Sequence, residues 1–151
     1  MATLPIRGSC LCGAVRFELT APPLFMACCH CSRCRKASGG MAATVAVRSQ
    51  DFRWVAGREH VVRYQPEPPW KLIRSFCGLC GTSLGEPDTN VEGGGFPIAA
   101  SALDDDPGLR VVLHECVADK PAWLDLCDDA HQLPGPTHET FAPGPPERRN
   151  S

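Results

Sequence analysis

The sequence predicts a mostly β domain, and three observations support this fold class. The apolar residues fall in short segments that either alternate with polar residues or run without interruption, as those of β-strands do. Clusters of proline and glycine separate these segments, a spacing typical of all-β and mostly β domains. Only residues 122–129 have the pattern of a helical turn. With 151 residues, 43% of them hydrophobic, the chain is long enough for one domain with its own core.

The expected strands follow from the pattern in each segment. Residues 14–20 alternate, with Val15, Phe17 and Leu19 on one face. The prolines that follow end this strand, because proline cannot donate to a β ladder. Residues 41–47 are apolar at nearly every position, which predicts a strand buried on both faces. Further strands are expected at residues 51–55, 61–64, 71–76, 96–100 and 109–114.

The charge balance and the first residues of the chain exclude several classes of protein. A formal net charge of -2 and a pI near 6.2 argue against general nucleic-acid binding, which usually requires a strongly basic face. No segment approaches the roughly 20 apolar residues of a membrane-spanning helix, and the N-terminal residues lack the pattern of a signal peptide. We therefore expect a cytoplasmic protein that binds neither nucleic acid nor membrane, with no indication of its oligomeric state.

Ten cysteines are the most informative feature of the composition. In a reducing compartment they indicate metal binding rather than disulfides. Seven of them form the clusters Cys10-x-Cys12, Cys29-x-Cys31-x-x-Cys34 and Cys77-x-x-Cys80. Cysteines so close together rarely pair with one another in a disulfide framework, so the spacing agrees with metal binding. The other three, Cys28, Cys116 and Cys127, are expected to be buried small apolar side chains or bystanders.

The first and last clusters together supply the four sulfurs of a closed zinc site. Closed tetrahedral sites with four protein ligands are structural, so Cys10, Cys12, Cys77 and Cys80 are predicted to hold a structural zinc. The sequence Cys-Gly-Leu-Cys-Gly at residues 77–81 resembles a zinc knuckle, in which glycines let backbone N–H groups point at the sulfurs. This ion would fasten the N-terminal strand to the middle of the domain.

The middle cluster has three sulfurs, the number that a catalytic zinc site uses while it keeps one position open. Cys29, Cys31 and Cys34 are therefore predicted to hold a second, catalytic zinc. An ion with three thiolates remains Lewis acidic enough to bind a fourth, and coordination deprotonates an incoming thiol. Such a sulfur-rich site suits a thiol substrate. Its carboxylates could be bound by the neighbouring basic residues, Arg33, Arg35 and Lys36.

One alternative for the middle cluster makes both zincs structural. Cys28 or His30 could supply a fourth ligand and close the second site. His30 lies between two of the ligands, where its side chain would normally point away from the ion that they share. A structural or solvent-exposed role is therefore expected for His30.

Three cysteine-containing segments carry a resemblance to a known family. They are G-S-C-L-C-G-A-V-R-F at 8–17, C-C-H-C-S-R-C-R-K-A-S-G at 28–39 and F-C-G-L-C-G-T-S-L at 76–84. Together they resemble the glutathione-dependent formaldehyde-activating enzyme family, which also includes centromere protein V. Leu113-His114 and Lys120-Pro121-Ala122-Trp123 are similar to the closing H…(K/R)xxW segment of that family. The resemblance covers roughly residues 5–133.

The resemblance implies a twisted, mostly antiparallel β-tent fold, with a structural zinc on the outer clusters and a catalytic zinc on Cys29, Cys31 and Cys34. It also implies carbon-sulfur lyase chemistry, in which glutathione and formaldehyde form S-(hydroxymethyl)glutathione or the reverse occurs. We therefore expect a zinc-dependent lyase that acts on a small thiol such as glutathione and an aldehyde. Residues 1–133 are expected to form this domain and residues 134–151 a proline-rich tail.

Two other functions are compatible with the same residues. A zinc-stabilised binding or interaction module would have no open coordination position and no catalysis. A redox enzyme similar to zinc-containing methionine sulfoxide reductases would need a separate nucleophilic cysteine that faces a pocket. Only Cys28, Cys116 or Cys127 is available for that role.

Overall fold

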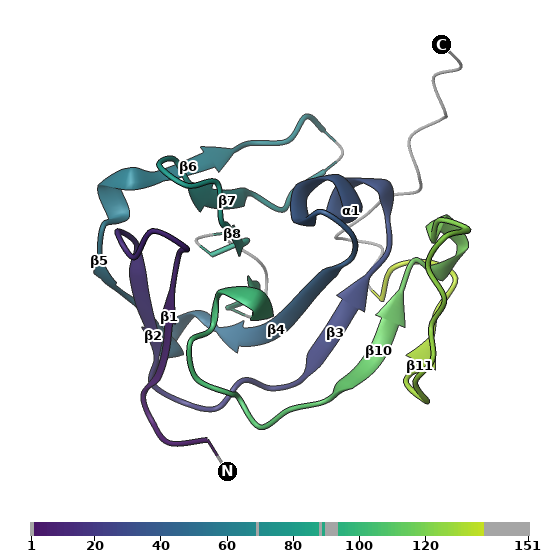
Figure 1. Ribbon diagram of the computed structural model, residues 1–151, viewed down its shortest axis with the longest axis horizontal. Helices are drawn as coiled ribbons and strands as arrows, with labels where there is room; N and C mark the ends of the chain where they lie inside the picture. The colour runs from purple at the N-terminus through teal and green to yellow at the C-terminus, as the bar shows by residue number, and fades with distance from the viewer. Residues whose placement is uncertain (1, 69, 88, 90–93, 138–151) are drawn as a thin grey trace.

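The computed structural model describes residues 2–68, 70–87, 89 and 94–137, and it confirms the mostly β class (Figure 1). The strands are β1 Ile6–Ser9, β2 Arg16–Leu19, β3 Met26–Cys29, β4 Ala42–Arg48, β5 Phe52–Ala56, β6 Val61–Tyr64, β7 Arg74–Cys77, β8 Ser83–Gly85, β9 Gly95–Ala99, β10 Val111–Glu115 and β11 His131–Gln132. The helical elements among the described residues are α1 Ser32–Ser38 and 3-10 turns at Ser49–Asp51, Arg58–His60, Ala100–Ala102 and Val117–Asp119.

The strands form two sheets, whose pairing is mostly antiparallel. One sheet has the order β1-β2-β5 and the other the order β11-β10-β3-β4-β9-β8-β7-β6. The exceptions are β3 and β11, which both pair with β10 in parallel. The β3–β10 register places Glu115 opposite Cys29, and Figure 1 shows these strands side by side with α1 beyond the end of β3. Residues that follow β10 therefore lie next to the middle cysteine cluster.

The core joins residues of both sheets in one cluster. Phe17 of β2, Val45 of β4 and Ile98 of β9 are all buried and belong to it. Phe17 also stacks on Phe52 of β5, with 5.3 Å between the ring centroids. Because alternate residues of a strand point to opposite faces, the alternation predicted for residues 14–20 places Phe17 in this shared core.

The helical turn expected at residues 122–129 is wrong. The chain forms only a turn at residues 122–123 there, and the nearest 3-10 turn is Val117–Asp119. The Lys120 ammonium donates to the carbonyl oxygen of Leu124. A side chain thus binds a backbone group that a helix would pair internally, and local side-chain hydrogen bonds of this kind compete with helix formation.

The start of the expected tail lies against the domain. The backbone N–H groups of Cys116 and Val117 donate to the carbonyl oxygens of Gly135 and Leu133, at 3.1 and 3.0 Å. Residues 138–151 lie outside the described residues, and the division of the chain at residue 133 stays a prediction.

None of the helices in the described parts of the chain has the length and hydrophobicity needed to cross a membrane.

Two glycines with similar backbone conformations allow a test of how closely the strands approach. Gly85 has a φ of 84°, and a Cβ there would lie 2.6 Å from the Ala99 nitrogen, whereas a Cβ on Gly108, with a φ of 70°, would meet nothing nearer than 3.7 Å. Gly108→Ala is expected to lower the free energy of unfolding by about 1–2 kcal/mol through backbone strain. Gly85→Ala should lower it by a further ~1–3 kcal/mol because of the steric overlap. Urea denaturation measures both, and equal losses would contradict the close packing of β8 on β9.

Candidate metal centres

The first centre contains the two outer cysteine clusters, of which the first follows β1 and the second begins at the last residue of β7. The sulfurs of Cys10, Cys12, Cys77 and Cys80 all lie within 4.8 Å of one another. The Cys12 sulfur is 3.5 Å from that of Cys10 and 3.9 Å from that of Cys77. A tetrahedral ion with Zn–S bonds of about 2.3 Å keeps its sulfurs roughly 3.8 Å apart. The four sulfurs therefore fit a tetrahedral metal ion.

Hydrogen bonds around the first centre favour thiolates. Val15 N–H donates to the Cys10 sulfur at 3.2 Å. The Thr82 hydroxyl accepts from Leu11 N–H at 2.9 Å and lies 3.2 Å from the Cys80 sulfur, so its proton is available to that sulfur. Hydrogen bonds from the Thr82 side chain and backbone lower the pKa of Cys80 to about 5. At Cys80 the protein thus favours the thiolate, which is the form that binds metal.

The second centre forms at the junction of β3 and α1. Cys29 ends β3, and the sulfurs of Cys29, Cys31 and Cys34 lie within 4.8 Å of one another. Cys31 is the N-cap of α1, and its sulfur accepts from Cys34 N–H at 3.3 Å. The helix brings Cys34 back over Cys31 after one turn, and it ends at Gly39 with a φ of 76°. These three sulfurs could hold a second metal ion.

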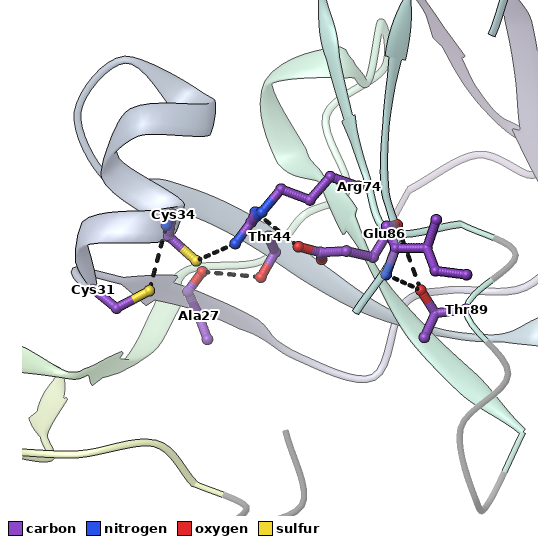
Figure 2. A network of polar contacts seen from close by, with 8 residues as sticks. Ala27, Cys31, Cys34, Thr44, Arg74, Glu86 and Thr89 are labelled. Carbon is purple, nitrogen blue, oxygen red and sulfur yellow. Dashed lines mark hydrogen bonds and ion pairs between the residues drawn. The ribbon is translucent and has the colours of Figure 1, made fainter. Parts of the chain in front are cut away.

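Figure 2 shows a polar network that connects the second centre to β7. The Arg74 guanidinium donates to the Cys34 sulfur at 3.2 Å and to the Glu86 carboxylate at 2.9 Å. Burial raises the pKa of Glu86 to about 7, against the opposing attraction of Arg74. The guanidinium places positive charge beside a cysteine that becomes negative when it binds metal.

A second network, formed by two histidines and a carboxylate, stabilises the turn between Cys29 and Cys31. The rings of His30 and His114 are both 1% exposed, and His30 Nε2 lies 2.7 Å from His114 Nδ1. Asp128 contacts His114 Nε2 at 3.0 Å. A carboxylate only accepts, so with both rings neutral His114 donates to Asp128 and accepts from His30. Of the two roles expected for His30, burial excludes the solvent-exposed one, and its ring belongs to this network and not to the three-sulfur group.

The second centre opens onto a cavity of about 110 Å³. The cavity is lined by Cys29, Cys31, Arg33, Cys34, Ala42, Thr44, Trp70, Leu72, Arg74, Glu86, Pro97, Glu115, Cys116 and Pro136. The Arg33 guanidinium lies 4.5 Å from the centre of the Trp70 ring. A neighbouring surface depression shares Arg33 and Arg74 with the cavity and adds Lys36 and Tyr64. Positive charge therefore extends from the cavity to the surface.

Two functional features were missed in the sequence. One is α1, although the glycine at residue 39, directly after its last residue, is a signal for the end of a helix. The other is Cys116, which was expected to be a buried small apolar side chain or a bystander; it is buried, and it lines the cavity together with Cys29 and Cys31. No spacing rule connects residues so far apart in the sequence. Cys28 is fully buried and Cys127 is exposed, in agreement with the expectation for them.

Removing one sulfur of the first centre tests its structural role. Cys77→Ser is expected to lose one metal ion and to melt far below the unchanged protein, because a structural zinc contributes about 10–16 kcal/mol in small peptide systems. Thermal melting with metal analysis measures both effects. Cys127→Ser, at an exposed cysteine, is the control. A Cys77→Ser protein that keeps its melting temperature and both metals would show that this centre has no structural role.

Arg74 allows a test of the second centre. Arg74→Lys keeps the positive charge but loses the planar group that donates to two partners at once. Metal affinity at the second centre is expected to fall about 10- to 100-fold, with no change at the first, as measured by competition with a chromophoric chelator. Arg53→Lys is the control, since Arg53 pairs with Glu18 on the exposed face. Unchanged affinity in Arg74→Lys would mean that the Cys34 contact is not used in binding.

Comparisons with known proteins identify the family of this chain. The model of the family described as "Glutathione-dependent formaldehyde-activating enzyme" matches residues 5–119, a range that contains all seven cysteines of both centres. A Halomonas elongata protein named after the same enzyme family is 33% identical over 126 residues, which cover 80% of each chain. The crystal structure of a Rhodobacter sphaeroides protein is 27% identical with a TM-score of 0.53, and the match covers 70% of this chain and 91% of that one. This chain is therefore a member of the glutathione-dependent formaldehyde-activating enzyme family.

Proposed function

We propose that the protein is a zinc-dependent carbon-sulfur lyase that forms or breaks the adduct of a small thiol and an aldehyde, with glutathione and formaldehyde as the expected pair. Zinc would occupy both centres, with a structural role in the first and a catalytic role in the second. The observation that carries the proposal is that the sulfurs of three cysteines lie within 4.8 Å of one another in the wall of a cavity. Such a donor set is typical of catalytic zinc.

Cys29, Cys31 and Cys34 would hold the catalytic ion. When bound, zinc supplies a positive charge that keeps a substrate thiol deprotonated near neutral pH. Arg74 holds the Cys34 sulfur in place and offsets part of the negative charge of the three thiolates. The remaining lining residues confine the aldehyde next to the substrate sulfur, which lowers the entropic cost of bringing the two reactants together.

The size of the cavity agrees with a small aldehyde. The cavity has a volume of about 110 Å³. This space is sufficient for a thiol sulfur with its methylene group and a one-carbon aldehyde. The rest of a tripeptide thiol would lie outside, in the neighbouring depression.

The depression has the charges that the carboxylates of glutathione would need. Arg33 and Lys36 line it, and both belong to the three basic residues that the sequence suggested for binding substrate carboxylates. The third expected residue, Arg35, instead has a buried Nε that finds no hydrogen-bond partner in the described residues. We therefore assign carboxylate binding to Arg33 and Lys36. The cytoplasmic location expected from the sequence stays a prediction.

Removing one ligand of the second centre separates an enzyme from a zinc-stabilised binding module. Cys31→Ala is expected to abolish the accelerated exchange between glutathione, formaldehyde and their adduct, because the two sulfurs that remain are too few to hold the catalytic ion. Exchange NMR measures the rate, and metal analysis should show that one ion remains. Cys127→Ala should behave like the unchanged protein. If the unchanged protein, loaded with two zincs, accelerates no pair of small thiol and aldehyde, the binding module replaces the enzyme.

A further inference from the structure

Cys116 is a fourth cysteine at the second centre, contributed by a distant part of the chain. It follows β10, whose parallel pairing with β3 places Glu115 opposite Cys29. His30 N–H donates to the Glu115 carbonyl oxygen at 3.0 Å. This hydrogen bond connects the segment after β3 to the end of β10. Cys116 is 5% exposed, and it lines the same cavity as the three cysteines of the second centre.

The backbone of Cys116 adopts an unfavourable conformation. Its φ of 57° makes it the only residue other than glycine with a positive φ in the described parts of the chain. A left-handed backbone costs roughly 1–2 kcal/mol for a residue with a Cβ. The surrounding structure holds it there, because Cys116 N–H donates to Gly135 and its carbonyl accepts from Asp119 N–H at 3.0 Å. Such strain in residues that line a site is commonly connected with function.

The contacts of the Cys116 thiol are with the metal-binding cysteines. It lines the same cavity as Cys29, Cys31 and Cys34, within hydrogen-bonding reach of the first two. The group of sulfurs within 4.8 Å of one another contains Cys29, Cys31 and Cys34, without Cys116. Cys116 therefore lies in the same cavity wall as the three ligands without belonging to their group, which is the position of a group that binds and leaves.

We propose that Cys116 is an exchangeable fourth ligand of the second centre, which a substrate thiol displaces and which then takes the proton of that thiol. This inference rests on the proposed function, because it assumes that a thiol enters the fourth position. At rest, four cysteine thiolates would surround a divalent ion. The open position would then be protected from water and from unrelated ligands until a thiol arrives.

The exchange balances in bonds, protons and charge. The bond between Cys116 and the ion breaks, and so does the S–H bond of the incoming thiol. The substrate sulfur takes the coordination position, and its proton forms an S–H bond on Cys116. No atom is oxidised or reduced, and the ion has four thiolates before and after the step. The net charge inside the cavity therefore stays constant, which avoids the cost of burying an additional unpaired charge.

Cadmium NMR tests this proposal, because cadmium binds thiolates as zinc does and each of the two centres gives its own signal. The protein is loaded with ¹¹³Cd under a reductant that is not a thiol, and each ion is correlated with the β protons of its cysteine ligands. We expect the second ion to correlate with four cysteines, Cys116 among them. Adding glutathione should remove the Cys116 correlation and leave the other three.

Two substitutions at Cys116 provide the matched comparison. Cys116→Gly suits the left-handed backbone, and Cys116→Ala keeps a Cβ; both should move the second ¹¹³Cd signal to the range of three thiolates. Glutathione should return it to the range of four, while the first signal stays unchanged throughout. Cys127→Ala should leave both signals unchanged.

The alternative outcomes separate this inference from the proposed function. In one outcome, the second ion correlates with only three cysteines in the unchanged protein, its signal does not change in Cys116→Gly, and it gains a thiolate when glutathione is added. This result would overturn the role of Cys116 but would still support the lyase function. Failure of the second centre to bind cadmium would overturn both. If the unchanged protein reduces methionine sulfoxide and Cys116→Gly does not, Cys116 is a redox nucleophile. This result would also overturn the proposal.

Discussion

The convergence of four cysteines at the first centre is the constraint on which the rest of the structure depends. Cys10 and Cys12 follow β1, in the 3-stranded sheet, and Cys77 ends β7, in the 8-stranded sheet. A metal ion shared by these cysteines would connect the two sheets. Because ligands must be placed within a few tenths of an ångström of the ion, such a connection determines where β7 lies. Free energy from metal binding then adds to that of a core of modest size.

The short strand β7 connects the two centres. Its last residue, Cys77, belongs to the first centre, and its first residue, Arg74, donates to the Cys34 sulfur of the second. Figure 2 shows Arg74 between Cys34 and Glu86. A strand places residues three apart on opposite faces, which allows one short element to serve both sites. The position of the charge beside the second centre thus depends on the structural integrity of the first.

The second centre combines a rigid local unit with contributions from distant residues. A strand end, an N-cap and the first turn of α1 bring three sulfurs together within six residues of sequence. Arg74 and Glu86 surround this unit with charge on one side, and the buried pair His30 and His114 supports it on another. Protein groups around the ligands tune the metal and hold the ligands in position. The buried charged and polar side chains around the second centre are therefore explained by their contacts with one another and with the metal-binding cysteines.

Local pattern and spacing were sufficient for the fold class, most of the strands and the two cysteine groups. Strands come from the repeat of two residues, as at Phe17, and metal ligands within a turn come from short spacings, as at Cys31 and Cys34; both are local properties of the chain. Cys116, Arg74 and His114 could not be assigned to the second centre in this way, because strand pairing brings them there from far along the sequence. The register of β10 on β3 depends on the packing of the whole sheet, and no local pattern encodes it. The sequence therefore determines which atoms can bind metal, whereas strand pairing determines which side chains surround each ion.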